Sequence, residues 1–187
     1  QDSGINGKIL VSYTSSLFDT KHVQMIGVSL IGGTFNLYNG AIESVCERWE
    51  AIGVNVSGGT FNMFGGKINA TAKVKTTNEY WGYGLNIENG NVQLKKGTIT
   101  GTNESGIYKD RAKAVKSSKS LMNILFEGYG IYKDESLLSM DATETANGTV
   151  EIKPIEYKIT YDKVGGTEIA GKNYPTQYNV ETPDFTI

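Results

Sequence analysis

The chain of 187 residues contains only one cysteine, one histidine and three prolines. Because Cys46 is alone, an intrachain disulfide framework is excluded, and because His22 is alone, no set of ligands exists for a structural zinc. A formal net charge of −2 gives no general attraction to nucleic acid or to anionic lipid. The chain also lacks an apolar run long enough to span a membrane, and residues 1–30 show no signal peptide. We therefore expect neither nucleic-acid binding nor membrane insertion.

Glycine, by contrast, occurs 23 times and marks an internal repeat. Residues 27–42 and 53–68 carry the same unit, which reads GVSLIGGTFNLYNGAI in the first copy and GVNVSGGTFNMFGGKI in the second. A third copy, residues 84–99, has Asn-Gly for Gly-Gly and a valine for the phenylalanine. Shorter copies, both reading GIYKD, begin at Gly106 and Gly130. With Gly4 opening the first unit, the chain holds about six units.

Within each copy, apolar and polar residues alternate as in a β-strand with one buried face. The runs are short and end at glycines, which supply the positive φ that a sharp corner needs. One copy therefore predicts three strands around three corners, and the copies are expected to stack in parallel as a β-solenoid of about six coils. The stack would form three interior columns: Val28, Val54 and Leu85; Phe35, Phe61 and Val92; and Leu37, Met63 and Leu94. Extra residues would leave the coil at one corner, at 43–52 and 69–83.

The segment GGTFNMFGGKIN, residues 58–69, resembles the repeats of right-handed parallel β-helix proteins of the pectate-lyase-like superfamily, especially those on large bacterial surface proteins. The resemblance covers about residues 4–153 and implies an all-β, right-handed parallel β-helix over residues 1–153. That superfamily includes both adhesins and carbohydrate-active enzymes, so the resemblance leaves both functions open. It also implies an extracellular location, either secreted or on the bacterial cell surface.

The sequence changes character near Lys153. Residues 157–167, which read YKITYDKVGGT, and residues 173–187 resemble the opening of the Listeria–Bacteroides repeat, a small β-grasp-like module found in tandem on bacterial surface proteins. The closing segment of that module is missing. We therefore expect residues 154–187 to form a truncated module, a short β extension, and the protein to be a monomer within a longer multi-module chain.

An enzyme of the pectate-lyase-like group would need clustered acidic residues, and the seven aspartates of this chain are spread along it. Only Asp110 and Asp134 occupy matching positions in successive units, where they would lie within about 5 Å of each other on neighbouring coils. Such a pair can share a proton or hold Ca²⁺. Flanking basic residues such as Arg111 would neutralise it, as on an ordinary solenoid surface. We therefore expect no metal and no catalytic residue, and the absence of a phosphate cradle predicts no cofactor.

Aromatic residues gather at the two longest expected insertions. Trp49 precedes Gly53, and Trp81 precedes Gly84 with two tyrosines beside it, Tyr80 and Tyr83. Aromatic faces one coil apart can stack on pyranose rings, while neighbouring charged groups bind the hydroxyls. This pattern predicts a shallow glycan-binding strip, whose charged members are Glu47, Arg48, Glu50 and Glu79. The alternative is that the rings fold back and cover the edge of the core, because tryptophan is usually largely buried.

The sequence thus favours a non-catalytic structural or adhesive module of a bacterial surface protein, with host or microbial glycans or surface proteins as partners. The alternative is a carbohydrate-active enzyme, either a polysaccharide lyase or a glycoside hydrolase, centred on Asp110 and Asp134.

Overall fold

The computed structural model describes residues 7–13, 23–73, 81–104, 109–161 and 174–183. These residues form β-strands and two short 3₁₀ helices, and most of the strands run parallel to their neighbours. The predicted all-β class with parallel sheets is therefore confirmed. No helix in the described residues is long and apolar enough to cross a membrane.

Three sheets build the body of the molecule. Sheet A contains, in spatial order, β1 (Lys8–Tyr13), β4 (Ala41–Cys46), β7 (Lys67–Ala72), β10 (Gly97–Asn103), β14 (Gly148–Pro154), β12 (Tyr129–Lys133) and β13 (Ser136–Leu137). Sheet B contains β11 (Lys113–Ser117), β8 (Gly82–Ile87), β5 (Glu50–Val56) and β2 (Gln24–Leu30). Sheet C contains β3 (Thr34–Leu37), β6 (Thr60–Met63) and β9 (Asn91–Leu94). The 3₁₀ helices are η1 (Lys109–Arg111) and η2 (Leu121–Ile124).

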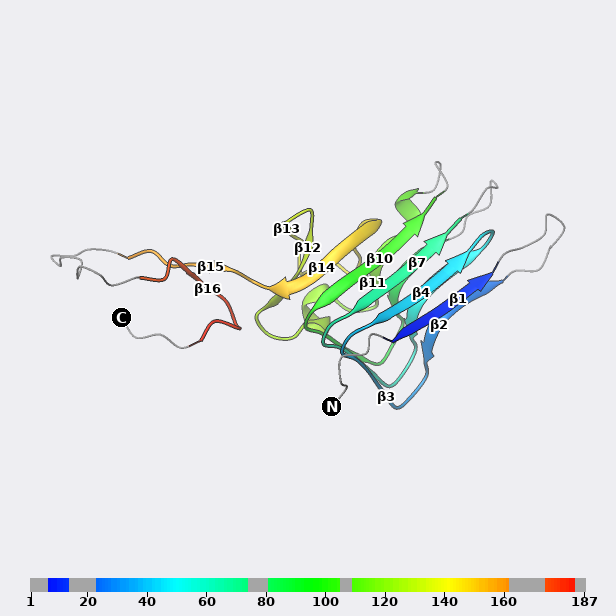
Figure 1. Cartoon of the computed structure of the whole chain (residues 1–187), viewed down its shortest axis with the longest axis horizontal. Coiled ribbons are helices and arrows are strands. Elements are labelled where there is room, and N and C mark those ends of the chain that lie inside the picture. Colours follow the sequence, from blue (N-terminus) through cyan, green and yellow to red (C-terminus); the bar gives the residue numbers. More distant parts are fainter. Residues whose placement is uncertain (1–6, 14–22, 74–80, 105–108, 162–173, 184–187) are drawn as a thin grey trace.

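The chain visits sheets B, C and A in turn, and three such circuits are complete: β2–β3–β4, β5–β6–β7 and β8–β9–β10. Each strand pairs in parallel with its equivalent in the next circuit. Figure 1 shows β1, β4, β7 and β10 side by side in this order. Circuits of this kind contact only their neighbours, so the stability of each depends on the one before and the one after it.

The predicted interior columns are present in the strand register. Val28 pairs with Val54 and Val54 with Leu85, in sheet B. In sheet C the two predicted columns likewise pair from β3 to β6 and from β6 to β9. The members in the second circuit, which are Val54, Phe61 and Met63, are completely buried. The alternation of apolar and polar residues therefore directs the side chains as expected.

Glycines serve two different purposes in the circuits. Gly33, Gly59 and Gly90 have positive φ and form the corner before sheet C, as predicted. The opening glycines Gly53 and Gly84, however, lie inside β5 and β8. A Cβ on Gly53 would approach the Gly84 carbonyl oxygen to 2.6 Å and would collide with Ile68. Glycine is needed there because neighbouring backbones approach closely, and no corner is involved.

The parallel stacking extends only in part to the unit at Gly106, where β11 pairs in parallel with β8 in sheet B, and it does not extend to the unit at Gly130. Strand β12, which contains Gly130, pairs antiparallel with β14, and β14 pairs antiparallel with β10. In sheet C the next position is occupied by η2, and only a single bridge joins Leu94 to Leu125. Residues 105–108, including Gly106, lie outside the described part. The last strands thus end the parallel stack instead of adding two further parallel coils to it.

Beyond Pro154, β15 (Tyr157–Lys158) and β16 (Gln177–Tyr178) form a separate two-stranded antiparallel sheet. The rings of Tyr157 and Tyr178 stack in it, with centroids 5.2 Å apart. Tyr129 of β12 donates a hydrogen bond of 2.7 Å to Glu181, so this C-terminal segment touches the body of the protein. Burial and the Glu181 carboxylate together raise the pKa of the Tyr129 hydroxyl to about 12.

Candidate ligand-binding surfaces

Trp81 and Tyr83 lie together on the outer face of sheet B. A Cβ on either glycine beside Tyr83 would meet the interior, at Thr102 for Gly82 and at Ile99 for Gly84, so the Tyr83 side chain between them points outward. Trp81 directly precedes β8. The two rings stack with centroids 6.4 Å apart and planes inclined by 15°. Both residues are half-buried, which leaves part of the pair open to a ligand. The structure thus brings together these two members of the predicted strip.

Charged groups of both signs surround the Tyr83 ring. The ammonium nitrogen of Lys116 lies 4.9 Å from the ring centroid, a cation–π distance. Burial raises the pKa of the Tyr83 hydroxyl to about 12, with further contributions from the carboxylates of Glu50 and Glu144 and a small opposing effect of Arg111. Glu144 also forms an ion pair of 3.0 Å with the partly buried Lys113. The surface therefore offers aromatic carbon, hydrogen-bond donors and hydrogen-bond acceptors within one small area.

Trp49 does not belong to this surface. Only 7% of it is exposed, and it forms a small second core with four buried residues, Cys46, Ala51, Ala70 and Ala72. The small alanine side chains on neighbouring strands leave room for the large ring. The glycan-strip prediction is therefore wrong for Trp49, which covers the edge of the core as the alternative stated.

The remaining predicted members of the strip divide into two groups. Glu47 and Arg48 are half-buried in the short connection between β4 and β5, next to the buried Trp49. Much of the expected insertion at 43–52 is strand, since β4 runs to Cys46 and β5 begins at Glu50. Glu79 and Tyr80 lie outside the described residues.

Asp110 and Asp134 are not stacked on neighbouring coils as the repeat predicted. Asp110 lies in η1, whereas Asp134 follows β12 in the tight turn to β13 with a positive φ of 48°. The antiparallel pairing of β12 removes the register that would have placed the two carboxylates one strand apart. In the part of the chain that the structure describes, no three histidine, cysteine, aspartate or glutamate side chains lie close enough to hold a metal ion.

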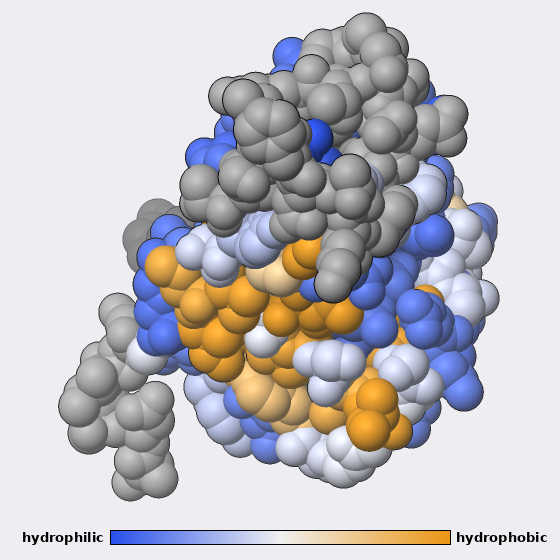
Figure 2. Space-filling view, turned by 90° about the vertical axis from the view of Figure 1, so that its right-hand side faces the viewer, coloured by the Kyte–Doolittle hydropathy of each residue, from blue (hydrophilic) through white to orange (hydrophobic). Residues whose placement is uncertain are grey.

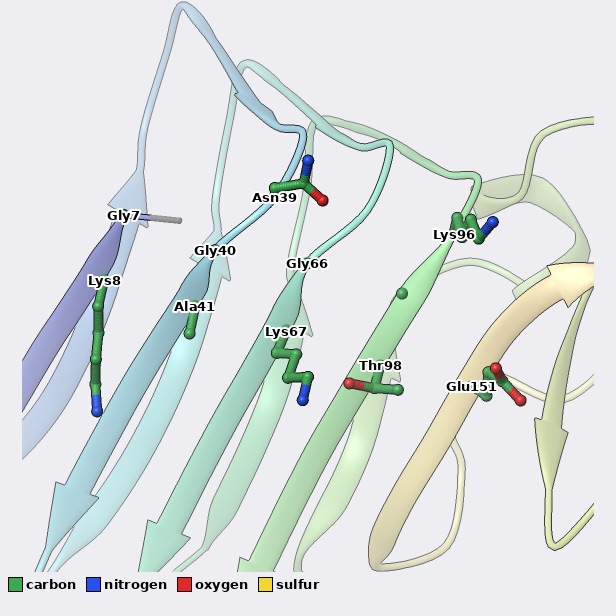
Figure 3. Close-up of a pocket in the computed structure, with 11 residues that line it drawn as sticks. Gly7, Lys8, Asn39, Gly40, Ala41, Gly66, Lys67, Lys96, Thr98 and Glu151 are labelled. Atoms are coloured by element: carbon green, nitrogen blue, oxygen red, sulfur yellow. The ribbon is translucent and has the colours of Figure 1, made fainter. Parts of the chain in front are cut away.

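A second surface, which the sequence analysis missed, is an open groove of about 560 Å³ on the outer face of sheet A. Three lysines line it, Lys8, Lys67 and Lys96, with Glu151 at the far side (Figure 3). Ala41 lies between Lys8 and Lys67 in the strand register, and its short side chain leaves the hollow. The signal was present in the sequence, because Lys8, Ala41 and Lys67 occupy the same position after the corner glycine in three units.

The charges of this groove are compensated only in part within the protein. Lys8 forms an ion pair of 2.6 Å with Glu43, and Glu151 lies 3.3 Å from Lys153. Within the described residues, no ion pair involves Lys67 or Lys96. The groove therefore carries a modest excess of positive charge and no aromatic platform in its lining.

An aromatic stack runs along the corner between sheets C and A. The rings of Tyr38 and Phe64 are nearly parallel, inclined by 12°, with centroids 4.9 Å apart. Phe64 also contacts Phe126 with centroids 5.7 Å apart. Phe64 lies between the other two rings, and of the three residues Tyr38 is the exposed one.

Comparison of the chain with models of known protein families, with characterised proteins and with solved structures found no match.

Proposed function

We propose that this chain is a non-catalytic structural or adhesive module of a bacterial surface or secreted protein, and that it binds glycans at Trp81 and Tyr83. The stacked strands are proposed to wind in the right-handed sense of pectate-lyase-like β-helices. The C-terminal hairpin is proposed to be the start of a Listeria–Bacteroides repeat. Support for the scaffold comes from the three in-register circuits, which present a rigid outer face.

The observation that carries the binding proposal is the stacked Trp81–Tyr83 pair beside Lys116. Aromatic rings pack against the apolar faces of pyranose rings, and a few charged groups around them fix the orientation of the hydroxyls. Glu50 sits on the adjacent strand, where it accepts a hydrogen bond of 2.8 Å from Gln24. Tyr83, Lys116 and Glu50 lie on strands, and Trp81 directly precedes β8, so most of the surface is formed before a ligand arrives.

The enzyme alternative has less support. A glycoside hydrolase places two carboxyl groups on either side of the scissile bond, and a lyase of this group needs an acidic cation site. Asp110 and Asp134 belong to separate elements that do not stack, so the arrangement expected for either chemistry is not formed by this pair.

Binding is tested by titrating the protein with neutral and uronic-acid polysaccharides while recording tryptophan fluorescence. We expect the emission to shift with at least one glycan and the shift to disappear in Trp81→Ala and Tyr83→Ala, both of which remain folded. Tyr38→Ala is the matched control, since it removes an exposed aromatic ring at a distant corner. Absence of binding to every glycan, or equal loss in the control, would overturn the proposal.

The same samples test for catalysis. Release of unsaturated or reducing-end products that depends on Asp110 or Asp134 would favour the enzyme alternative. We expect no product with or without Ca²⁺.

A further inference from the structure

The lysine groove on sheet A follows one row of paired residues. In the strand register the successive partners on β1, β4, β7, β10 and β14 are Lys8, Ala41, Lys67, Thr98 and Glu151. Ile68 and Ile99, which follow Lys67 and Thr98 along their strands, are completely buried. Because successive side chains on a strand point to opposite faces, the row points outward. The groove is thus a continuous line of outward-facing side chains across five strands.

Two positive charges in this groove have no carboxylate partner among the described residues. Lys67 and Lys96 are both exposed, and neither forms an ion pair there. Lys67 lies on β7 and Lys96 directly precedes β10, and these strands have described neighbours on both sides, β4 and β14. The pair therefore does not belong to the edge of the sheet. A lysine ammonium is a compact charge with three donors, so both groups can bind an anion.

Hydrogen-bonding side chains lie beside the two lysines. Asn39 and Thr98 line the groove itself (Figure 3). In the next outward-facing row Asn69 is the partner of Thr100, whose hydroxyl oxygen lies 2.9 Å from that of Thr149. Amide and hydroxyl groups both donate and accept hydrogen bonds, as a ligand rich in hydroxyls requires. This polar face differs from the end of the body near β1 and β2, where Figure 2 shows hydrophobic residues gathered.

The arrangement of the two lysines indicates the form of the ligand. Lys96 lies two residues before Thr98, the partner of Lys67, so their Cα atoms are about 8 Å apart. Figure 3 shows the two lysine side chains extending in different directions. A chain with repeated anionic groups fits this arrangement better than one small anion does. A nucleic acid fits less well, because the lining of the groove has no aromatic ring on which bases could stack.

We propose that this groove binds a linear acidic polysaccharide, whose carboxylate or sulfate groups pair with Lys67 and Lys96 while its hydroxyls contact Thr98 and Asn69. Because the lysines are exposed, the attraction weakens as the salt concentration rises. The groove lies on sheet A, whereas the glycan proposal above concerns Trp81 and Tyr83 at sheet B. The groove is therefore a second binding site, and either proposal can fail without the other.

The test is isothermal titration calorimetry of the full chain with dextran sulfate, polygalacturonate and uncharged dextran. Dextran and dextran sulfate share one backbone, so their comparison isolates the anionic group. We expect binding to at least one acidic polymer, an affinity that falls as salt is added, and no binding to dextran. The acidic polymer that binds identifies the group as sulfate or carboxylate. Repeating the titrations with Trp81→Ala removes any contribution of the aromatic pair on sheet B.

Variants assign the binding to the groove. Lys67→Gln with Lys96→Gln should weaken it about tenfold, because two ion pairs with the ligand are lost. Lys109→Gln with Lys158→Gln is the matched control, since it removes the same net charge at exposed positions outside the groove. Ala41→Phe should also weaken binding without any change of charge, because the larger side chain fills the hollow between Lys8 and Lys67.

Circular dichroism establishes that each variant is folded. The lysine pair keeps the test decisive if Ala41→Phe unfolds, because both lysines are exposed. Absence of binding to both acidic polymers, equal binding of dextran and dextran sulfate, or an equal loss in the control pair would each overturn the proposal.

Discussion

The ring of Phe35 stacks on the ring of Phe61, with centroids 6.0 Å apart and planes inclined by 25°. The two residues are direct partners in the parallel pairing of β3 and β6, and both point into the same column. Phe61 has a circuit on each side and is completely buried, whereas Phe35 has a described circuit on one side only. Both residues are phenylalanines, so their different contributions to the free energy of unfolding come from their positions in the stack.

Phe61→Ala should destabilise the protein by about 3–5 kcal/mol, because it opens a cavity between two circuits that cannot close around it. Phe35→Ala should cost clearly less, since its ring is already partly in water. Urea unfolding measures both losses. Equal losses, or a Phe61→Ala protein as stable as the parent, would show that the column is not packed as described.

Gly53→Ala should cost about 1–3 kcal/mol through overpacking. The added methyl group would collide with Ile68 and would lie 2.6 Å from the Gly84 carbonyl oxygen. Gly32→Ala is the matched control, because a Cβ at Gly32 meets nothing within 4 Å. Melting temperatures of the two variants give the comparison, and a Gly32→Ala protein that is the less stable of the two would contradict the close approach of the strands.

The columns could be predicted from the sequence because the repeat and the two-residue alternation specify the same facing for Val28, Phe35 and Leu37 in every copy. The antiparallel pairing of β14 with β10 and β12 could not be predicted from the sequence. The copies at Gly106 and Gly130 share only five residues, and such a short match leaves the direction of a strand undetermined.

Only part of the candidate site could be predicted, because local sequence does not show which side chains the rest of the fold covers. Both tryptophans precede an opening glycine, and the local sequence does not show which ring is covered. What separates them is the packing of Trp49 against Ala51 of β5 and against Ala70 and Ala72 of β7. The matching positions of Lys8, Ala41 and Lys67 indicate that these residues are neighbours across strands, but the repeat alone does not show that the short side chain of Ala41 leaves a hollow between the two lysines.

Acrylamide quenching should divide the two tryptophans into one protected and one accessible fluorophore. Trp49 is buried and Trp81 is half-buried, so their emission maxima should also differ, with that of Trp49 at shorter wavelength. Trp81→Phe should remove the accessible component and leave the protected one. If Trp49→Phe removed the accessible component instead, the assignment of the two environments would be reversed.

Stability should fall as the pH rises from about 10 to about 12, in part because of Tyr83. The pKa of this hydroxyl is about 12 in the folded protein, compared with 10.0 for a tyrosine exposed to water, as in the unfolded chain. Between these values the unfolded chain releases the proton first, so the unfolded state binds fewer protons and gains stability relative to the folded state. Below pH 10 both states are protonated and Tyr83 contributes no pH dependence.

Tyr83→Phe should make this alkaline decline shallower without removing it, because the pKa of Tyr129 is also raised to about 12. Unfolding free energies measured at several pH values between 9 and 12 provide the check. An unchanged slope in Tyr83→Phe would show that the Tyr83 hydroxyl titrates normally.

The parallel, in-register stacking of β3 on β6 is tested most directly by engineered disulfides in a Cys46→Ala background, which removes the single native thiol. Asn36 and Asn62 are register partners whose amide groups share a hydrogen bond of 2.8 Å, and paired strands lie about 4.8 Å apart, within reach of a disulfide. Asn36→Cys with Asn62→Cys should therefore oxidise readily, as read by mass spectrometry of non-reduced peptides. Thr34→Cys with Asn62→Cys is two residues out of register, about 8 Å apart, and should remain reduced. Preferential oxidation of the second pair, or of neither, would contradict the stacking on which the account depends.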